Sequence, residues 1–344
     1  MKPSKSIIST ESSNERVKSE VDVEFAQDVE INETREFVCG EAQHGLRVDN
    51  ALVQLVSEFS RSYLKQLIEQ GLARLNGQMV AKVASKVKAG DLLAIDLQAT
   101  PQSQAFKPEK VAFEVIFEDE YLLVINKPVG LVVHPAPGNW SGTLLNGLLE
   151  RDPNAVLLPR AGIVHRLDKD TSGLMVVART RQVMDALVQK IAAREVNRLY
   201  LALGLKTWTG PKELDVSESI GRDPRNRLKM AVLASDNQNG KTAKTSFNLL
   251  QNCEQGCFVS CRLHTGRTHQ IRVHMAYIGH PLVADSVYGG VQAADMLRQA
   301  LHAEQLAFEH PVTGQAMHFV ASLPQDFKQA LTHWSLSYNG VSTK

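Results

Sequence analysis

The sequence predicts an α+β protein of two domains that follow an unstructured amino-terminal tail, and three observations support this. The 344 residues are enough for two hydrophobic cores. The polar segment 100–108 separates two regions that each have regular apolar patterning. Both regions combine short amphipathic helical patterns with strand patterns joined by tight turns. We therefore expect a tail at 1–36, a small domain at 37–99, a linker at 100–108 and a larger domain at 109–344.

The composition is ordinary for a soluble globular protein, with 43% apolar and 22% charged residues. No apolar run approaches the roughly 20 residues that a membrane-spanning helix needs. The start of the chain lacks the apolar core of a secretion signal. We therefore expect a cytoplasmic protein without a membrane partner.

The charge is unevenly distributed, although the formal net charge is only +1. Residues 1–44 contain 5 basic and 10 acidic residues, whereas the rest of the chain contains 33 basic and 27 acidic ones. Within residues 160–230 the numbers are 14 and 8. Such a basic excess suits a polyanion, because phosphate contacts dominate nucleic-acid affinity. The alternative is an ordinary solvated surface.

The tail at 1–36 is rich in Ser, Glu, Asp, Asn and Lys and poor in aromatic residues. A segment of this composition cannot bury enough apolar surface to offset the entropy of ordering. We therefore expect a disordered acidic extension. Two roles fit it: a plain solvated segment, or a shield over the basic surface that a nucleic acid displaces.

The first domain begins with two helical patterns. Apolar residues recur at helical spacing over 48–56, and Asp49 lies early, where the helix dipole favours an acid. Ser60 and Ser62 are candidate caps of a second helix, which ends at Gly71. A short sheet follows, because Asn76 and the glycine after it form a strong hairpin signal before a last strand at 92–97.

This order of elements resembles the S4 RNA-binding domain over residues 44–97. The positions that carry the likeness are Arg47, Asp49, Ser60, Arg61, Ile68, Gly71, Asn76, Gly77, Gly90 and Asp91. Arg61 and Lys65 lie four residues apart on one helix face, where they could hold RNA phosphates. Ordinary surface charge is the alternative interpretation.

The second domain mixes strand and helix patterns along its length. Strand patterns occupy 111–117, 121–126, 197–204 and 258–263. Helical patterns occupy 142–149, 183–193, 268–278 and 327–334.

The most distinctive stretch runs from Ala161 to Arg179 and reads AGIVHRLDKDTSGLMVVAR. An apolar lead at 161–164 precedes a dense polar turn (residues 165–172), and a second apolar run at 174–178 follows. Each flank has the length and β-branched content of a buried strand, so we expect the polar turn between two strands. Polar groups at the ends of rigid elements are well positioned for catalysis. A solvated charged turn is the alternative.

The polar turn closely resembles the catalytic signature of the RluA family of RNA pseudouridine synthases, H-R-L-D-x-x-T-S-G-L. The matching residues are His165, Arg166, Leu167, Asp168, Thr171, Ser172, Gly173 and Leu174. The resemblance implies that Asp168 is the aspartate essential to the reaction. It also implies that Arg166 takes the place of a base extruded from the RNA.

Two other segments resemble motifs of the same family. INKPVGLVVHP, which contains Lys127 and His134, is similar to its first motif, but a structural β-turn is an equal explanation and we assign no chemistry to either residue. The R-x-Y-x-A pattern around Tyr200 is similar to its second motif. That likeness implies that Tyr200 stacks on the target uracil, whereas core packing is the alternative.

A third motif is matched by TGRTHQIRVH, and this likeness implies that Arg267 pairs with Asp168. Arginine suits the role, since a carboxylate in a closed pocket needs a charge partner and a guanidinium offers a two-pronged one. The chain departs from the family's G-D-P-V-Y-G continuation by Ala284 and Ser286 around Asp285. We expect this change to alter the loop and not the chemistry.

The basic segment 220–232 resembles a family segment that approaches RNA. Its candidate phosphate contacts are Arg222, Arg225, Arg227 and Lys229. An exposed turn without a partner is the alternative.

No metal site is expected. His269 and His274 are five residues apart, about 140° around a helix, without a nearby acid or cysteine to complete a site. Cys253, Cys257 and Cys261 are evenly spaced, but residues 254–256 form a hairpin turn between them. Zinc sites favour tighter pairs and a fourth ligand, so buried thiols are the better interpretation.

The resemblance covers about residues 44–330. It implies a central mixed, largely antiparallel sheet and an enzyme that isomerises uridine to pseudouridine within RNA, without a metal or other cofactor. The branch of the family that acts on large-subunit ribosomal RNA is the most similar. It implies a target in the stem-loop that faces the small subunit. We expect the enzyme to act within pre-ribosomal particles and as a monomer, although the sequence does not fix the oligomeric state.

Two other classes of function remain as alternatives. A non-catalytic RNA-binding or assembly factor could keep the fold, although the intact Asp168 does not favour it. A hydrolase could cleave a glycosidic bond, but it would need a second acid near Asp168, and only Asp170 offers itself. The sequence leaves open which uridines are modified and whether Asp168 acts as a nucleophile or as a base.

Overall fold

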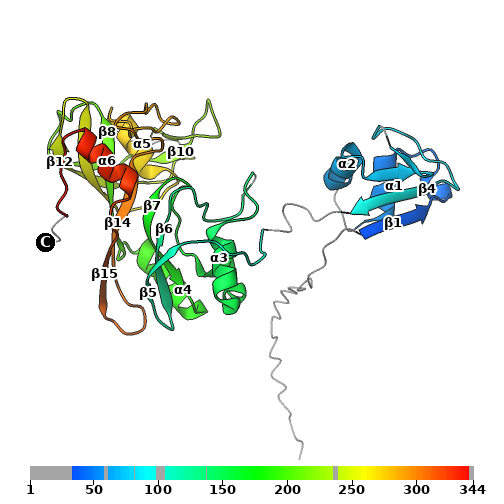
Figure 1. Ribbon diagram of the computed structural model, residues 1–344, viewed down its shortest axis with the longest axis horizontal. Helices are drawn as coiled ribbons and strands as arrows, with labels where there is room; N and C mark the ends of the chain where they lie inside the picture. Colours follow the sequence, from blue (N-terminus) through cyan, green and yellow to red (C-terminus); the bar gives the residue numbers. More distant parts are fainter. Residues whose placement is uncertain are drawn as a thin grey trace, which may run out of the picture. The chain divides into compact units, whose positions relative to one another are not determined.

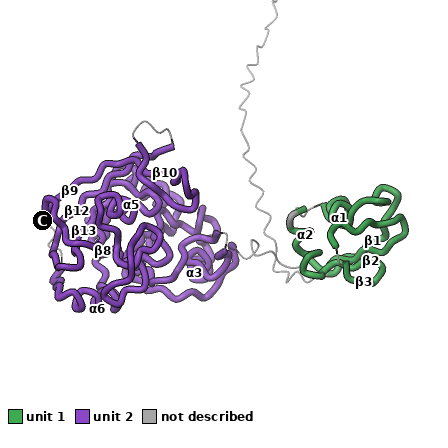
Figure 2. The backbone as a smooth tube through the Cα atoms, turned by 90° about the horizontal axis from the view of Figure 1, so that it is seen from above, with its two compact units in different colours: residues 1–100 green, residues 101–344 purple. Residues whose placement is uncertain are grey.

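The computed structural model describes residues 33–57, 61–80, 82–97, 105–136, 138–234 and 239–340. The chain divides into two compact units, residues 1–100 and 101–344 (Figure 2). No helix in these described ranges is both long and apolar enough to cross a membrane.

The small unit packs two short helices against one face of a four-stranded sheet (Figure 1). The helices are α1 (Val48–Leu55) and α2 (Arg61–Glu69), and a short 3-10 turn, η1 (Glu41–Gln43), precedes them. The sheet has the order β1 (Glu33–Val38), β4 (Leu92–Leu97), β2 (Ala73–Leu75) and β3 (Gln78–Met79). Apolar residues of both helices and of β4 form its core.

Strand β1 corrects the predicted extent of the tail. It pairs with β4 along its whole length, from Glu33 opposite Leu97 to Val38 opposite Leu92. The prediction of an unstructured segment is therefore wrong for residues 33–36. This strand lies at the sheet edge, and Phe37 packs against the core while charged residues alternate with it, so its composition resembles that of a tail. The rest of the predicted tail lies outside the described residues.

The predicted turns of the small unit are present. Helix α2 closes at Gly71, whose φ of 78° is left-handed, and the amide of Leu72 bonds to the carbonyl of Leu67. Asn76 and Gly77, with φ of 52° and 79°, form the turn between β2 and β3. Ser60 and the side chain of Ser62 lie outside the described residues, so their predicted capping is not tested.

The large unit contains a nine-stranded mixed sheet. Its order is β5 (Glu114–Glu118), β6 (Leu122–Lys127), β7 (Ser172–Ala178), β14 (Leu301–Glu309), β8 (Asn197–Leu205), β13 (Gly256–Leu263), β12 (Thr245–Asn252) and β9 (Glu213–Val216), with β15 (Ala316–Val320) paired to β14. The pairing of β14 with β7 is parallel, and the other described pairings are antiparallel. The prediction of a mixed, largely antiparallel sheet is therefore confirmed.

Helices cover both faces of this sheet (Figure 1). One face carries α3 (Leu144–Arg151) and α5 (Gln270–Tyr277), and the other carries α4 (Arg181–Ala192) and α6 (Gln325–His333). Short 3-10 turns, η3 (Pro153–Leu157) and η4 (Pro159–Gly162), follow α3. A separate hairpin consists of β10 (Ile220–Arg222) and β11 (Met230–Val232).

The polar turn leads straight into the middle of the sheet. Its last residue, Ser172, starts β7 and pairs in parallel with His302 of β14, and Gly173 pairs with Ala303. A Cβ at Gly173 would lie 2.1 Å from the carbonyl oxygen of Ala303, so only glycine permits this approach. Tyr200 of β8 is paired with the same Ala303. The turn therefore begins next to Tyr200.

The apolar lead before the polar turn is not a strand, contrary to the prediction. Arg160, Ala161 and Gly162 have left-handed φ values of 55°, 53° and 79°, which bend the chain into η4. Only Ile163 makes a bridge, with Val177 of β7. A Cβ at Gly162 would meet the carbonyl oxygen of Ala178 at 1.9 Å, so the chain crosses β7 too closely to extend along it.

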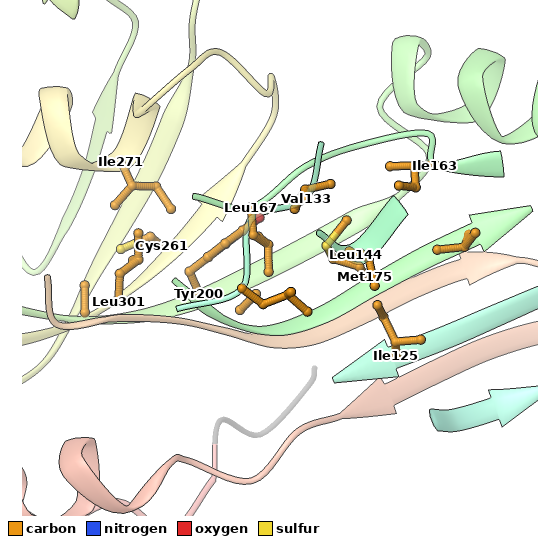
Figure 3. Close-up of a cluster of buried hydrophobic side chains, with 14 of the residues drawn as sticks. Ile125, Val133, Leu144, Ile163, Leu167, Met175, Tyr200, Cys261, Ile271 and Leu301 are labelled. Carbon is orange, nitrogen blue, oxygen red and sulfur yellow. The ribbon is translucent and has the colours of Figure 1, made fainter. Parts of the chain in front are cut away.

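The main hydrophobic core lies under the polar turn (Figure 3). It joins Ile125 and Met175 of the sheet to Leu144 of α3, and it continues past Leu167 to Tyr200. Cys257 and Cys261 are buried in it, and burial raises the pKa of the Cys257 thiol to about 12. The predicted hairpin turn between β12 and β13 separates Cys257 and Cys261 from Cys253. Among the described residues, no cluster of side chains that could bind a metal ion occurs.

Candidate active site

A cavity opens beside the polar turn. Its lining comprises Arg166, Leu167, Asp168, Thr171, Tyr200, Leu263, Arg267, His269, Gln270, Ile271, Arg272 and Leu301. The four residues to which the sequence analysis gave roles in catalysis or base flipping, Arg166, Asp168, Tyr200 and Arg267, therefore lie around one space. The apolar part of the lining belongs to the main core (Figure 3).

Two buried cations hold the backbone of the polar turn. Lys127 is fully buried, and its Nζ donates to the carbonyls of Pro128, Leu131 and Lys169 at 2.8–2.9 Å. Burial lowers the pKa of Lys127 to about 8. The Nη1 of Arg298 donates to the carbonyl of Asp170 at 2.9 Å. Consecutive carbonyls after Asp168 are thus fixed from two sides, which positions its carboxylate.

The far end of the turn is held in the same way. Arg298 is itself anchored by Asp326, with nitrogen–oxygen distances of 2.6 and 3.0 Å. The Oγ of Ser172 bonds to Nδ1 of His302 at 2.9 Å. Because burial lowers the pKa of His302 to about 4, its imidazole is neutral at ordinary pH.

Asp168 pairs with Arg272, and the predicted pair with Arg267 is wrong. The Nη1 of Arg272 lies 3.0 Å from Oδ2 of Asp168. Arg267 is exposed at the cavity rim, and its Nε donates to the carbonyl of Thr242 at 3.1 Å. The sequence analysis started a helix at Thr268, whereas α5 begins two residues later.

The cause lies at the start of α5. His269 has a left-handed φ of 56°, and the backbone amide of Arg267 donates to the Oε1 of Gln270. These features turn the chain just before α5 begins. Arg267 therefore lies outside the helix, whereas Arg272 lies within it and is buried. Arg272 lies between the apolar residues Ile271 and Val273, and a buried arginine needs an acid as its partner, so this signal could have identified Arg272 from the sequence.

Arg272 connects two carboxylates. Its Nε and Nη2 also bond to Asp285 at 2.7 and 2.8 Å. Burial alone would lower the pKa of Arg272, but Asp285 and Asp168 raise it above its ordinary value. The side chain of Asp285 is 0% exposed and that of Asp168 is 18% exposed, so only Asp168 offers a carboxylate oxygen to the cavity.

The loop at Asp285 therefore belongs to the site, although we expected the departures at Ala284 and Ser286 to leave the chemistry untouched. Ala284 has a left-handed φ of 59°, a conformation in which glycine, the residue of the family pattern, is unstrained. Asp285 keeps its bonds to Arg272 nevertheless.

His269 and Tyr288 complete the surroundings of Asp168; from the sequence, His269 was considered only as a metal ligand and rejected, and Tyr288 was given no role. The Nε2 of His269 lies 3.7 Å from Oδ1 of Asp168, and its Nδ1 lies 2.7 Å from the Tyr288 hydroxyl. That hydroxyl accepts the amide hydrogen of Met230, so its own hydrogen can go to Nδ1. This places the imidazole proton on Nε2, facing Asp168, and burial keeps the pKa of His269 low.

Tyr200 forms the apolar wall of the cavity. The residue lies on β8, which pairs with β13 on one side and β14 on the other, and only 5% of it is exposed. Burial raises the pKa of its phenol, which therefore stays neutral. A flat, uncharged ring beside a carboxylate can receive a planar, uncharged base.

Comparisons with known proteins agree with this geometry. The RNA pseudouridylate synthase family matches residues 121–277, and the S4 domain matches residues 46–93. A protein of Xanthomonas campestris pv. campestris called ribosomal large subunit pseudouridine synthase D is 43% identical over 311 residues, 87% of this chain and 92% of the relative. The chain belongs to the RNA pseudouridylate synthase family.

Other members of the family support the assignment. A Yersinia pestis protein with the same description is 41% identical over 320 residues, which are 89% of this chain and 95% of the relative. The solved structure of human RNA pseudouridylate synthase domain containing 4 has a TM-score of 0.54 at 23% identity. It covers 66% of this chain and 95% of its own, and this likeness shows the fold. The predicted enzyme class, an RNA pseudouridine synthase with an S4 domain, is confirmed.

The basic residues of this synthase have different surroundings. Arg166 is exposed at the cavity rim. Arg225 and Arg227 are exposed near the tip of the hairpin β10–β11, outside the cavity lining. Arg222 is also exposed, and its Nη1 donates to the carbonyl of Arg227 at 3.0 Å. Lys229 instead anchors the hairpin, because its Nζ donates to the carbonyl of Val287 at 2.7 Å.

The candidate RNA contacts of the S4 domain are engaged in ion pairs. Arg61 lies 2.7 Å from Oδ2 of the buried Asp49, yet its side chain remains 57% exposed. Lys65 lies 3.6 Å from Glu69, one turn further along α2. Both cations are accessible on the surface of the small unit, and their binding of RNA remains a prediction.

Proposed function

We propose that this synthase isomerises specific uridines of large-subunit ribosomal RNA to pseudouridine, with Asp168 as the catalytic residue. The observation that carries the proposal is the carboxylate of Asp168, which faces a cavity between Tyr200 and Arg272. Relatives described as ribosomal large subunit pseudouridine synthase D support the choice of RNA. The expected target is the stem-loop that faces the small subunit, within pre-ribosomal particles, and the enzyme acts as a monomer.

The reaction rearranges bonds without any net gain or loss of atoms. The glycosidic carbon–nitrogen bond breaks, the uracil rotates in the cavity, and a carbon–carbon bond forms to C5; C5 then releases its proton and N1 takes up one proton in its place. Asp168 either attacks the sugar as a nucleophile or removes a proton from it. Arg272 holds one carboxylate oxygen, and the other is open to the sugar. Neither route needs a redox step or an external group.

A uridine in a stem-loop must leave the base stack before it reaches Asp168. Tyr200, in the lining of the cavity, offers a ring on which the base stacks, a contact worth roughly 1–3 kcal/mol. Arg166, exposed at the rim, takes the place that the base vacates in the RNA.

A glycosidic hydrolase fits the site less well. Such enzymes use two carboxylates that flank the bond. Asp168 is the one acid among the described residues that line the cavity, and Asp285 is covered by Arg272. Asp170 is absent from the lining, and its carbonyl is bound by Arg298. The site therefore favours isomerisation over hydrolysis.

Asp168→Asn tests the proposal. With RNA that carries tritium at C5 of uridine, the wild-type enzyme should release tritium, and Asp168→Asn should be slower by roughly a thousandfold or more. Asp170→Asn, the same change two residues away, should retain nearly full activity. Pseudouridine maps of ribosomal RNA from wild-type, deletion and Asp168→Asn cells identify the targets. A site that is lost in the deletion but survives in the Asp168→Asn cells would remove Asp168 from the mechanism.

A further inference from the structure

Arg198 is a buried cation beside the active site that the proposed chemistry does not use. It lies on β8, two residues before Tyr200 and on the same face of the strand, and only 6% of it is exposed. Its Nε is buried without a hydrogen-bond partner among the described residues. Arginine is seldom buried without a partner, because the charge loses its hydration.

The other deeply buried arginines of the large unit differ from Arg198 in this respect. Arg272, with a 7% exposed side chain, binds Asp168 and Asp285. Arg298, also 7% exposed, binds Asp326. Within the described part of the chain, no such ion pair is formed by Arg198. The guanidinium therefore has an unmet need for an anion.

Gly266 lies directly against the head of Arg198. A Cβ at position 266 would lie 3.0 Å from Nη1 of Arg198. Gly266 does not have the positive φ that would itself require glycine, in contrast to Gly162 or Gly173. The missing side chain thus serves access to the guanidinium, since an alanine here would lie against it.

The guanidinium is close to two residues, Gly266 and His165, that directly precede residues of the cavity lining. Gly266 directly precedes Arg267, and His165, whose pKa burial and then Arg198 lower to about 3, directly precedes Arg166. His165 is neutral and adds no positive charge of its own, and the rim beyond it carries the exposed guanidinium groups of Arg166 and Arg267.

We propose that Arg198 and Gly266 form a binding site for one phosphodiester of the substrate RNA, next to the extruded uridine. The inference rests on the proposed function and deepens it. A phosphate oxygen reaches the guanidinium past the Cα of Gly266, which carries no side chain, and accepts the hydrogen bond that the guanidinium otherwise lacks. A guanidinium suits a phosphate because it can bind two oxygens at once. The positive charges of Arg166 and Arg267 attract the phosphate backbone of the RNA toward Arg198 and Gly266. The contact fixes the nucleotide and takes no part in bond making.

The first test measures RNA binding and turnover of the full-length enzyme. Arg198→Gln should raise KM for the stem-loop RNA roughly tenfold or more, because a bond to a charged group is lost, and should leave kcat within about threefold. It should also reduce the salt dependence of binding by about one phosphate contact. Arg181→Gln removes the same charge from exposed α4 on the opposite sheet face and should change neither quantity.

The second test locates the phosphate. RNAs that carry a single uncharged methylphosphonate linkage near the target uridine are compared with unmodified RNA. At one position, the methylphosphonate linkage should weaken binding of the RNA to the wild-type enzyme. The same linkage should not weaken binding to the Arg198→Gln variant any further, because the linkage and the substitution remove the same contact. Gly266→Ala keeps the charge but covers Nη1, so it should weaken binding in the same linkage-dependent way.

The outcomes separate the two proposals. If the wild-type enzyme releases no tritium from any ribosomal stem-loop, the proposed function fails. If the wild-type enzyme is active while Gly266→Ala binds RNA normally, or while no linkage shows the shared loss, the phosphate site is overturned. Should Arg198→Gln fail to fold, Gly266→Ala and the modified RNAs decide the question alone.

Discussion

The polar turn at 165–172 and the basic hairpin at 220–232 are similar in composition but differ in construction. In the turn, Lys127 and Arg298 hold consecutive backbone carbonyls from inside the protein. The hairpin is closed by its own residues, as when Asp223 accepts the amide hydrogen of Arg225, and its arginines are exposed. A charged segment that performs chemistry needs a fixed backbone, whereas one that contacts phosphates needs reach and charge.

The two regions are nevertheless connected. The amide of Met230, at the base of the hairpin, donates to the Tyr288 hydroxyl, which bonds to His269. His269 faces Asp168, and the guanidinium of Arg272 lies 5.0 Å from the centre of the Tyr288 ring. The hairpin is thus anchored in the same side chains that surround the carboxylate of Asp168, the proposed catalytic residue.

The largest difference in activity and stability is expected between substitutions of two arginines of the third motif. Arg272→Gln leaves Asp168 and Asp285 close together without their shared cation, so kcat should fall by roughly a thousandfold and stability by about 3–5 kcal/mol. Arg267→Gln removes a rim charge and should raise KM several-fold at unchanged stability. Steady-state kinetics and thermal unfolding of both variants check this. Equal effects of the two changes would contradict the assignment of Arg272 as the partner of Asp168.

Two lysines provide the next contrast. Lys127→Met removes three donors from buried carbonyls and should cost about 4 kcal/mol of unfolding free energy, with a loss of kcat as the turn loosens. Lys229→Met removes one partly exposed bond and should cost about 1 kcal/mol or less. Denaturant unfolding monitored by fluorescence measures both. A Lys127→Met protein as stable as the wild type would show that the turn does not depend on this lysine.

As the pH falls, the polar turn should lose stability at a higher pH than the hairpin does, because the hairpin contains no histidine. The pKa of His302 is lowered by burial to about 4, so the unfolded chain binds its proton first as the pH falls. Its contribution to stability is complete above pH 6.5 and is lost toward pH 4, on the order of 3 kcal/mol in total. His302→Gln should flatten this part of the stability profile, whereas His333→Gln, at an exposed site, should leave it unchanged. Identical profiles for His302→Gln and the wild type would exclude His302 as the titrating group.

The polar turn could be found from the sequence because its residues are adjacent in the chain. The strand at Tyr200 and the terminal helix were also predictable, since their apolar periodicity is regular. Strand β1 was not, because the backbone bonds of an edge strand leave little trace in composition. Local patterns therefore identified the elements that bury apolar faces.

The ion-pair partner of Asp168 could not be predicted from such local patterns in the sequence. Arg267 and Arg272 are five residues apart in one motif, and which of them faces inward depends on where α5 begins. That start is set by the left-handed His269 and by the side chain of Gln270, which are details of conformation. Asp285, the second acid on Arg272, lies 13 residues further on and meets it only in the folded chain.

The smallest effect is expected at the hairpin tip, where Arg225 and Arg227 are exposed. Replacing both with Gln should leave the unfolding free energy within about 0.5 kcal/mol, because surface changes of this kind disturb no packing. RNA affinity should fall roughly tenfold, and the slope of log affinity against log salt should decrease by about two, as each lost phosphate contact removes about one. Binding at three or more salt concentrations measures the slope. If affinity and slope are unchanged, these arginines are an exposed turn without a partner, and the hairpin contributes only through its anchor at Tyr288.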